Sequence, residues 1–231
     1  MLKIIQITDI HIGGDYNGKF DVKGNFEKVL TANRKHTFDL LVLTGDIADN
    51  NYLENYQYVK NTLSKYLPNI NYIVLGGNHD NMRVLYSVFS NNSNIEKVHN
   101  VNFPECCISF VDTSDGTLKD NFIEKIEGKI VFTHYPLAHI LHNFMSNFRL
   151  KNEDHVAEML FNKGVRDVFC GHFHNDDYVE SNINIHLTPS TQCQIDKSSD
   201  KFKVSSYAPG YREIHIDNRG LISNDIVRYI I

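Results

Sequence analysis

Five short apolar runs in this chain of 231 residues end abruptly in aspartate, asparagine or histidine. The clearest of them is Tyr72–Leu75, which is followed directly by Gly76-Gly77-Asn78-His79-Asp80. The two glycines allow a sharp turn and a close approach of the backbone to a ligand, while three polar side chains arrive together where the run ends. A packed core has no use for such a segment, so we interpret it as a reactive loop.

The other four runs follow the same pattern. Each is apolar enough to form a strand that is covered on both faces, and each ends in a possible ligand. The runs and the residues that follow them are Leu2–Thr8 with Asp9 and His11, Asp39–Thr44 with Asp46, Lys129–Thr133 with His134, and Val165–Cys170 with His172 and His174.

Amphipathic helices separate the first three runs, with apolar residues at helical spacing in 25–35 and 53–67. The alternation of strand and helix predicts an α/β fold with a parallel sheet. Cys106–Val111 is a further expected strand, and 84–88 and 156–164 are expected helices. We find no repeat, linker or low-complexity stretch, and we expect residues 1–231 to form one domain.

The pattern changes after Cys170, because helical spacing stops and alternating strands begin. We expect antiparallel strands at Ile183–Leu187, Gln192–Ile195, Tyr211–Ile216 and Leu221–Tyr229, with a hairpin turn over 217–220. Ser90–Asn94 is expected to be a surface loop, and Leu137–Asn152 has no clear assignment beyond a border of the site.

The carboxyl ends of parallel strands meet at one edge of a sheet, so residues that follow five such strands can converge. Oxygen and imidazole ligands without thiolate favour Mn, Fe, Co or Zn, and seven side chains are too many for one ion. We therefore expect two divalent metals about 3.5 to 4 Å apart, bridged by Asp46. A single histidine at a strand end is more often structural, but the recurrence at five ends argues against that alternative. The predicted ligands are Asp9, His11, Asp46, Asn78, His134, His172 and His174.

Composition limits the partners of such a site. A formal net charge of −5 offers no general affinity for nucleic acid or anionic membranes, so a negatively charged substrate needs the metals as its positive source. The longest apolar runs fall short of the ~20 residues that span a bilayer, and we expect a cytoplasmic protein. We expect the four cysteines to be reduced, buried thiols, and they are Cys106, Cys107, Cys170 and Cys193. The histidines outside the motif pattern are expected to be surface or structural residues, and they are His36, His99, His155, His186 and His215.

The motifs DxH, GDxxD, GNHD, H and GHxH occur in this order, and together they resemble the calcineurin-like metallophosphoesterase family. The resemblance implies a four-layer α/β/β/α sandwich of two mixed sheets with a dinuclear site at the strand ends. One metal would be held by Asp9, His11, Asp46 and His174, and the other by Asp46, Asn78, His134 and His172. Purple acid phosphatases are disfavoured within the family, because Asp49 stands where their tyrosine ligand would be.

The same resemblance implies a catalytic mechanism. A metal-bridging hydroxide would attack phosphorus, and His79 would approach the leaving group. A protonated His79, oriented by Asp49 or Asp80, could supply the proton that a poor alkoxide leaving group requires. Asn78 and His79 would then also contact the substrate.

The tail is similar to class III cyclic nucleotide phosphodiesterases, in segments 189–192, 208–212, 220–221 and 227–228. The chain departs from the sequence pattern of these phosphodiesterases at Gly76, at Thr133 and in a shortened segment between Gly116 and Gly128. These departures leave the predicted metal ligands intact but affect the rim of the substrate-binding site. We expect the rim in Leu137–Asn152 and Ser190–Gly210, through the side chains of Phe144, Phe148, Asn152, Gln192 and Tyr207.

The sequence therefore predicts a phosphodiesterase that converts 3',5'-cyclic AMP or GMP to the 5'-monophosphate. A glycerophosphodiester or broad-specificity phosphodiesterase is the enzymatic alternative, since only the rim selects among alcohols. A metal-binding scaffold without activity is a more distant alternative, because all the ligands are present.

Overall fold

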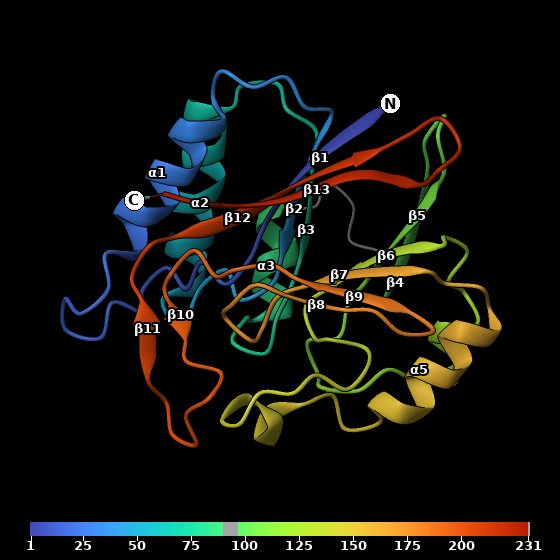
Figure 1. Cartoon of the computed structure of the whole chain (residues 1–231). Helices are drawn as coiled ribbons and strands as arrows, with labels where there is room; N and C mark the ends of the chain where they lie inside the picture. Colours follow the sequence, from blue (N-terminus) through green and yellow to red (C-terminus); the bar gives the residue numbers. More distant parts are fainter. Residues whose placement is uncertain (90–96, 231) are drawn as a thin grey trace.

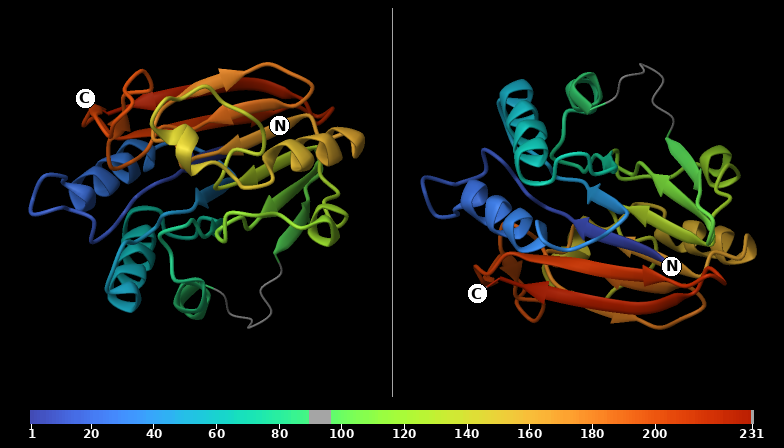
Figure 2. Two further views of the ribbon diagram at one scale, coloured as in Figure 1. Left: turned by 90° about the horizontal axis from the view of Figure 1, so that it is seen from below. Right: turned by 90° about the horizontal axis from the view of Figure 1, so that it is seen from above.

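Two β-sheets lie face to face, and helices cover the outer face of each (Figure 1, Figure 2). The computed structural model describes residues 1–89 and 97–230, so the loop expected at Ser90–Asn94 lies outside the described residues. The four layers confirm the α/β/β/α sandwich that the family resemblance implied.

The first sheet has the strand order β13-β12-β1-β2-β3. Its three parallel strands are β1 (Leu2–Ile7), β2 (Leu40–Thr44) and β3 (Tyr72–Leu75), and the chain returns at its end to add β12 (Gly210–Ile216) and β13 (Ile222–Tyr229) antiparallel to them. The helices of this half are α1 (Val22–Asn33), α2 (Tyr52–Tyr66) and α3 (Met82–Phe89).

The second sheet has the order β4-β5-β6-β7-β9-β8, with four parallel strands inside and an antiparallel strand at each edge. The strands are β4 (Val98–Asn102), β5 (Cys107–Val111), β6 (Ile130–Thr133), β7 (Asp167–Cys170), β8 (Asp177–Val179) and β9 (Asn184–Leu187). The remaining elements are α4 (Asp120–Ile123), the 3-10 helix η1 (Met145–Phe148), α5 (Glu153–Asn162), and a small ribbon of β10 (Gln194–Ile195) and β11 (Val204–Ser206).

The side chains of the central strands alternate between two cores, which explains their uninterrupted apolar sequences. In β2, Leu40 and Val42 point between the sheets, whereas Leu41 and Leu43 pack under the helices of the first half. In β6, Phe132 joins the core between the sheets and Val131 joins the core under the other helical layer. Three apolar cores therefore hold four layers together.

The parallel pairing expected from the strand–helix alternation is confirmed for β1, β2 and β3, and the expected antiparallel strands of the tail complete the first of two mixed sheets. Several element predictions needed correction. The predictions missed β4, β8 and β11, whose short or polar sequences carry little apolar alternation, and Gln192–Ile195 is a strand only at its last two residues. The first helix begins earlier than expected, at Val22, because Asp21 caps it by accepting a hydrogen bond from the Gly24 N–H at 3.1 Å.

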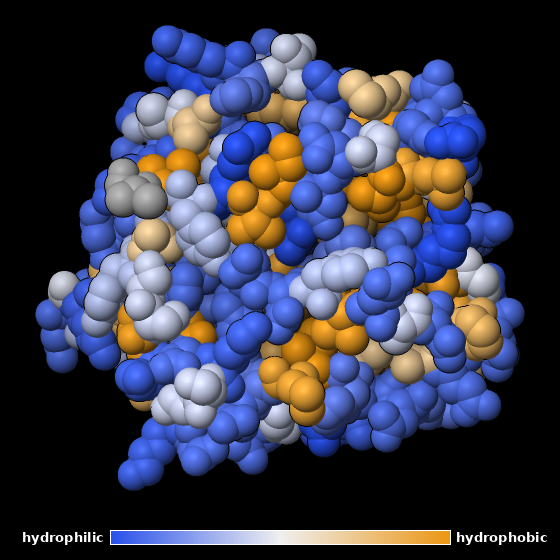
Figure 3. Space-filling model, viewed as in Figure 1, coloured by the Kyte–Doolittle hydropathy of each residue, from blue (hydrophilic) through white to orange (hydrophobic). Residues whose placement is uncertain are grey.

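In the described ranges 1–89 and 97–230, no helix combines the length and the apolarity that crossing a bilayer requires. The face shown in Figure 3 is largely hydrophilic, with separate apolar patches between polar side chains.

A buried ion cluster connects the two sheets away from the predicted metal ligands. His186 of β9 is 4% exposed, and its ring nitrogens lie 2.6 Å from Asp225 Oδ2 of β13 and 3.1 Å from Asp167 Oδ1 of β7. Arg212 of β12 also pairs with Asp225. Burial lowers the pKa of His186, but its hydrogen bonds to Asp167 and Asp225 outweigh burial, so that the pKa lies above its ordinary value. The protonated ring donates to carboxylates of both sheets.

We predict that His186→Ala lowers the free energy of unfolding by about 3 kcal/mol near pH 6, because it removes the imidazolium that pairs with the buried Asp167 carboxylate and leaves Asp225 with Arg212 alone. The raised folded-state pKa means that the contribution is complete below the unfolded pKa of about 6.5 and is lost as the pH rises through the folded value. Urea unfolding at pH 6 and pH 9 measures this, with exposed His99→Ala as the matched control. A loss no larger than that of the control, or a difference that grows with pH, would contradict the assignment.

Candidate metal centre

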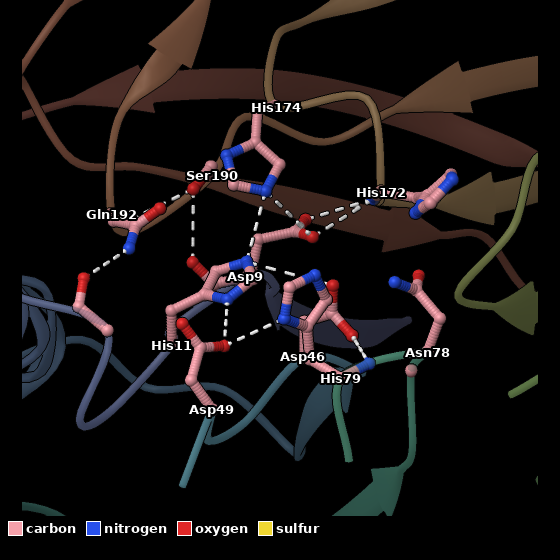
Figure 4. A network of polar contacts seen from close by, with 12 residues as sticks. Asp9, His11, Asp46, Asp49, Asn78, His79, His172, His174, Ser190 and Gln192 are labelled. Atoms are coloured by element: carbon pink, nitrogen blue, oxygen red, sulfur yellow. Dashed lines mark hydrogen bonds and ion pairs between the residues drawn. The ribbon is translucent and has the colours of Figure 1, made fainter. Parts of the chain in front are cut away.

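The carboxyl ends of β1, β2, β3, β6 and β7 meet where the two sheets adjoin, and the predicted ligands lie together there (Figure 4). Among the described residues, three groups have all their possible ligand atoms within 4.8 Å of one another, and two of them consist of predicted ligands. The first group is Asp9, His11 and His174, and the second is Asp46, His134 and His172. The third group is His11, Asp49 and His79, which shares His11 with the first of these two. Asn78 joins the second group, since its Oδ1 lies 3.1 Å from His134 Nε2. All seven predicted ligands are thus brought together.

Each candidate histidine uses one ring nitrogen to contact an oxygen outside the ligand set. His134 Nδ1 lies 2.8 Å from the Thr44 carbonyl oxygen, and His174 Nδ1 lies 3.2 Å from that of Cys193. His172 uses Nε2 for this contact, at 2.8 Å from the carbonyl oxygen of Phe148. His11 uses Nδ1, which lies 2.6 Å from Asp49 Oδ1. These contacts orient each ring and leave its other nitrogen facing the cluster, where it could coordinate a metal after giving up its proton.

The inward nitrogens show where a cation fits. His11 Nε2 and His174 Nε2 lie only 3.1 Å apart, and His174 Nε2 lies 3.4 Å from Asp9 Oδ1. Two imidazole nitrogens and a carboxylate oxygen that converge in this way form a donor set that a bound cation would stabilise in place of a proton. The donor set therefore fits borderline divalent ions.

Asp46 lies between the two groups. Its Oδ2 is 3.3 Å from His134 Nε2 and 3.7 Å from His11 Nε2, and its Oδ1 accepts a hydrogen bond from the His79 backbone N–H at 2.9 Å. A Cβ atom on Gly77 would lie 2.2 Å from Asp46 Oδ1, so only glycine lets the GNHD loop approach this closely. This position is the one that a bridging carboxylate needs.

Backbone strain is concentrated at these residues. Five of the seven candidate ligands have a positive φ, with 52° at Asp9, 53° at His11, 51° at Asp46, 69° at His172 and 53° at His174. Left-handed conformations of residues other than glycine persist where the surrounding structure enforces them, and they cluster at functional sites. The strain supports a functional reading of the cluster over a structural one.

Electrostatics divide the histidines into two kinds in the protein without bound ions. Burial and the neighbouring His134 lower the pKa of His172 to about 3, which leaves the ring neutral. Burial also lowers the pKa of His134, but Asp46 outweighs burial and raises that pKa to about 9. Burial raises the pKa of Asp46, whereas the imidazoles of His134 and His11 hold it well below its ordinary range. The site is thus a dense set of charges that the protein balances internally.

The three residues predicted to act in proton transfer take different places. His79 Nδ1 lies 3.0 Å from Asp49 Oδ1, and the same oxygen contacts His11, so Asp49 links a candidate ligand to the exposed imidazole. Asp80 instead accepts hydrogen bonds from the backbone N–H groups of Ile47 and Gly77 and from the Tyr56 hydroxyl. Asp49 is therefore the carboxylate that orients His79, and Asp80 ties the GDxxD loop to the GNHD loop.

The tail segment predicted from the resemblance also reaches the site. Ser190 Oγ donates to the Asp9 carbonyl oxygen at 3.0 Å, and Gln192 Nε2 donates to the Gly14 carbonyl oxygen at 2.8 Å (Figure 4). These bonds hold the loop that carries Asp9 and His11. The segment between Gly116 and Gly128 contains only the four-residue α4, in keeping with the shortening expected there.

A cavity of about 340 Å³ opens beside the candidate ligands. Of the expected rim residues, Phe144, Phe148 and Gln192 line it. Asn152 does not line the cavity, because its side-chain amide is hydrogen-bonded to the backbone N–H and carbonyl of Leu118. Tyr207 does not line it either and packs against Phe20, with ring centroids 5.9 Å apart. Met145, Ile195 and Phe202 also line the cavity and lie within the two segments predicted to form the rim, although their side chains were not singled out. Tyr16, Lys19 and Phe20 were missed, because they lie in a loop without periodicity.

Comparison with known proteins agrees with the geometry. A family model described as "Calcineurin-like phosphoesterase" matches residues 2–176, and the chain belongs to this family of metal-dependent phosphoesterases. The expected enzyme class is therefore confirmed. The family uses a dinuclear divalent metal site, and the two groups of predicted ligands are candidate clusters to hold it.

Relatives along most of the chain carry phosphodiesterase names. The chain is 33% identical to a "Probable cyclic nucleotide phosphodiesterase" of Fibrobacter succinogenes, over 93% of this chain and 89% of that protein. It is 25% identical to the "3',5'-cyclic adenosine monophosphate phosphodiesterase CpdA" of Escherichia coli K12, over 98% and 90%. It is also 30% identical to a "Probable glycerophosphodiester phosphodiesterase GpdQ" of Arcobacter nitrofigilis, over 85% and 82%.

Solved structures share the fold at low identity. A dimetal phosphatase from Danio rerio superimposes with a TM-score of 0.66 and 11% identity, over 98% of both chains. The purple acid phosphatase PPD1 of yellow lupin superimposes with a TM-score of 0.67 and 11% identity, over 98% of this chain and 53% of that one. These similarities confirm the fold.

We predict that Asp46→Asn loses both metals, whereas His11→Ala loses mainly one. An amide removes the charge and leaves one good ligand oxygen where a bridge needs two, while His11 is expected to hold only one of the two ions. Elemental analysis after dialysis counts the metals per chain, with the exposed Asp154→Asn as the matched control. Retention of two tightly bound metals by Asp46→Asn would overturn the bridging assignment.

Proposed function

We propose that the protein hydrolyses 3',5'-cyclic nucleotides to 5'-monophosphates at the candidate metal centre. The observation that carries the proposal is the position of the two ligand groups, which lie on either side of Asp46 beside a cavity of about 340 Å³. That volume is at the small end of the range for ligand pockets and suits one nucleotide. The relatives named as cyclic nucleotide phosphodiesterases support the same substrate class.

Two bound divalent ions would polarise the phosphoryl oxygens and acidify a water molecule near neutral pH. Asp9, His11 and His174 would hold one ion, Asn78, His134 and His172 the other, and Asp46 both. The outward contacts of the four histidines orient the inward nitrogens toward the ions, and the buried carboxylates would supply the negative charge that offsets them.

The reaction is an in-line displacement at phosphorus. The oxygen of water forms a bond to phosphorus, the bond from phosphorus to the ribose 3'-oxygen breaks, and that oxygen takes up a proton. We assign the proton to the imidazole of His79, which lines the cavity and is 40% exposed at its side chain. Asp49 holds the ring through Nδ1, so the ring is oriented for donation from its other nitrogen.

Glycerophosphodiester hydrolysis is the second candidate. It is favoured by the relative from Arcobacter nitrofigilis, whose name assigns that activity. The same ligand groups would serve both reactions, and the residues lining the rest of the cavity decide between them. Five aromatic rings line it, from Tyr16, Phe20, Phe144, Phe148 and Phe202. Such rings suit a flat base better than glycerol.

We predict that the protein, loaded separately with Mn, Fe, Co or Zn, converts a cyclic nucleotide to its 5'-monophosphate and hydrolyses that monophosphate far more slowly. The product carries one more negative charge, so a site that turns over must favour the cyclic form in the transition state. Chromatography of the products from cyclic nucleotides, glycerophosphocholine and 4-nitrophenyl phosphate measures this. Turnover of glycerophosphodiesters or monoesters alone, under every metal, would reject the proposal in favour of the alternative.

We predict that His79→Ala slows hydrolysis of a cyclic nucleotide about 100-fold, as the loss of a general acid does, and spares a nitrophenyl diester whose anion leaves unaided. Steady-state kinetics on both substrates measure the difference, with exposed His36→Ala as the control. Equal losses on the two substrates would show that His79 acts through structure or charge.

A further inference from the structure

The aromatic part of the cavity is assembled from three separate segments. Phe144 packs against Phe148 at 5.3 Å and against Phe202 at 5.9 Å between ring centroids. Tyr16 packs edge-to-face on Phe20 at 5.8 Å. The carbonyl oxygen of Phe148 also lies 2.8 Å from His172 Nε2, so the aromatic wall adjoins a candidate metal ligand directly. A ligand held by the metals would therefore extend onto these rings.

Lys19 joins the two aromatic groups. Its Nζ lies 5.3 Å from the ring centroid of Phe20 and 5.8 Å from that of Phe202. Among the described residues that line the cavity, Lys19 is the one lysine or arginine. Attraction to two ring faces holds the ammonium in the cavity, where it can meet a ligand.

This ammonium limits what the rings can bind. A quaternary or primary ammonium, such as the headgroup of a glycerophosphodiester, would meet a like charge where an aromatic cage should attract it. A neutral, flat base can stack on the rings and accept hydrogen bonds from Lys19. Lysine donates three hydrogen bonds and accepts none, so it distinguishes bases by their acceptors.

We propose that Lys19, with the rings of Phe20 and Phe202, forms a base subsite that prefers guanine to adenine; this inference rests on the proposed cyclic nucleotide activity. The guanine edge presents two acceptors, N7 and O6, whereas adenine replaces O6 with an amino donor that the ammonium repels. The substrate favoured by the site is therefore cyclic GMP. A discrimination of this kind is worth about 1 to 3 kcal/mol, or roughly 5- to 150-fold.

The test compares kcat/KM for cyclic GMP and cyclic AMP in the metal-loaded wild type, Lys19→Met and Lys23→Met. Methionine keeps an unbranched apolar stem for the rings but removes the donor. Lys23 is the matched control, because it is exposed and its Nζ lies over Tyr58, at 4.8 Å, outside the cavity. We expect the wild type and Lys23→Met to prefer cyclic GMP about 10-fold, and Lys19→Met to lose that preference through cyclic GMP alone.

Equal kcat/KM for the two substrates in the wild type would overturn the inference and leave the proposed function standing. An equal decrease of kcat/KM for cyclic GMP and cyclic AMP in Lys19→Met would also overturn it, because Lys19 would then act on the phosphate group that both substrates share. If neither cyclic nucleotide is hydrolysed, the proposed function fails, and calorimetric titration of the metal-loaded protein with 5'-GMP and 5'-AMP still decides the base preference. Tighter binding of GMP that disappears in Lys19→Met supports the subsite, and equal affinities contradict it.

Discussion

The buried carboxylate of Asp46 is the group on which the rest of the site depends. It is 2% exposed, and an isolated charge in that position would cost far more than a protein's net stability. Imidazoles of His11 and His134 and the backbone N–H of His79 surround it, and these come from three different strand ends. Balancing this one charge therefore requires the DxH loop, the GNHD loop and the end of β6 to meet at one point.

The sandwich makes that meeting possible. Each sheet alone places its parallel strand ends along one edge, and stacking the sheets brings the two edges together (Figure 2). Bonds across the junction keep them there, such as that between His134 Nδ1 and the Thr44 carbonyl oxygen. The strained φ values of Asp9, His11, Asp46, His172 and His174 are the conformational cost of aiming side chains from two sheets at a shared centre.

The convergence of the candidate metal ligands could be predicted because each follows an apolar strand, and the ends of parallel strands meet at one edge of a sheet. The cavity wall could be predicted only in part. Phe144, Phe148 and Phe202 lie in the two segments expected to form the rim, whereas Lys19 lies in a polar loop with no pattern that sets it apart. His186 had no place in the motif pattern, because its carboxylate partners come from β7 and β13 and only tertiary structure brings them together. A residue whose role depends on partners that are distant in the sequence therefore has little in its neighbouring residues that would reveal that role.

The central claim is that this chain hydrolyses a cyclic phosphodiester by attack of water on phosphorus at the shared centre of the two ligand groups. Turnover of cyclic GMP in oxygen-18 water, followed by phosphorus NMR, tests it most directly. The account predicts that the product is 5'-GMP, with one oxygen-18 atom on phosphorus. A 3'-monophosphate, a product without the label on phosphorus, or no turnover with Mn, Fe, Co or Zn would contradict it.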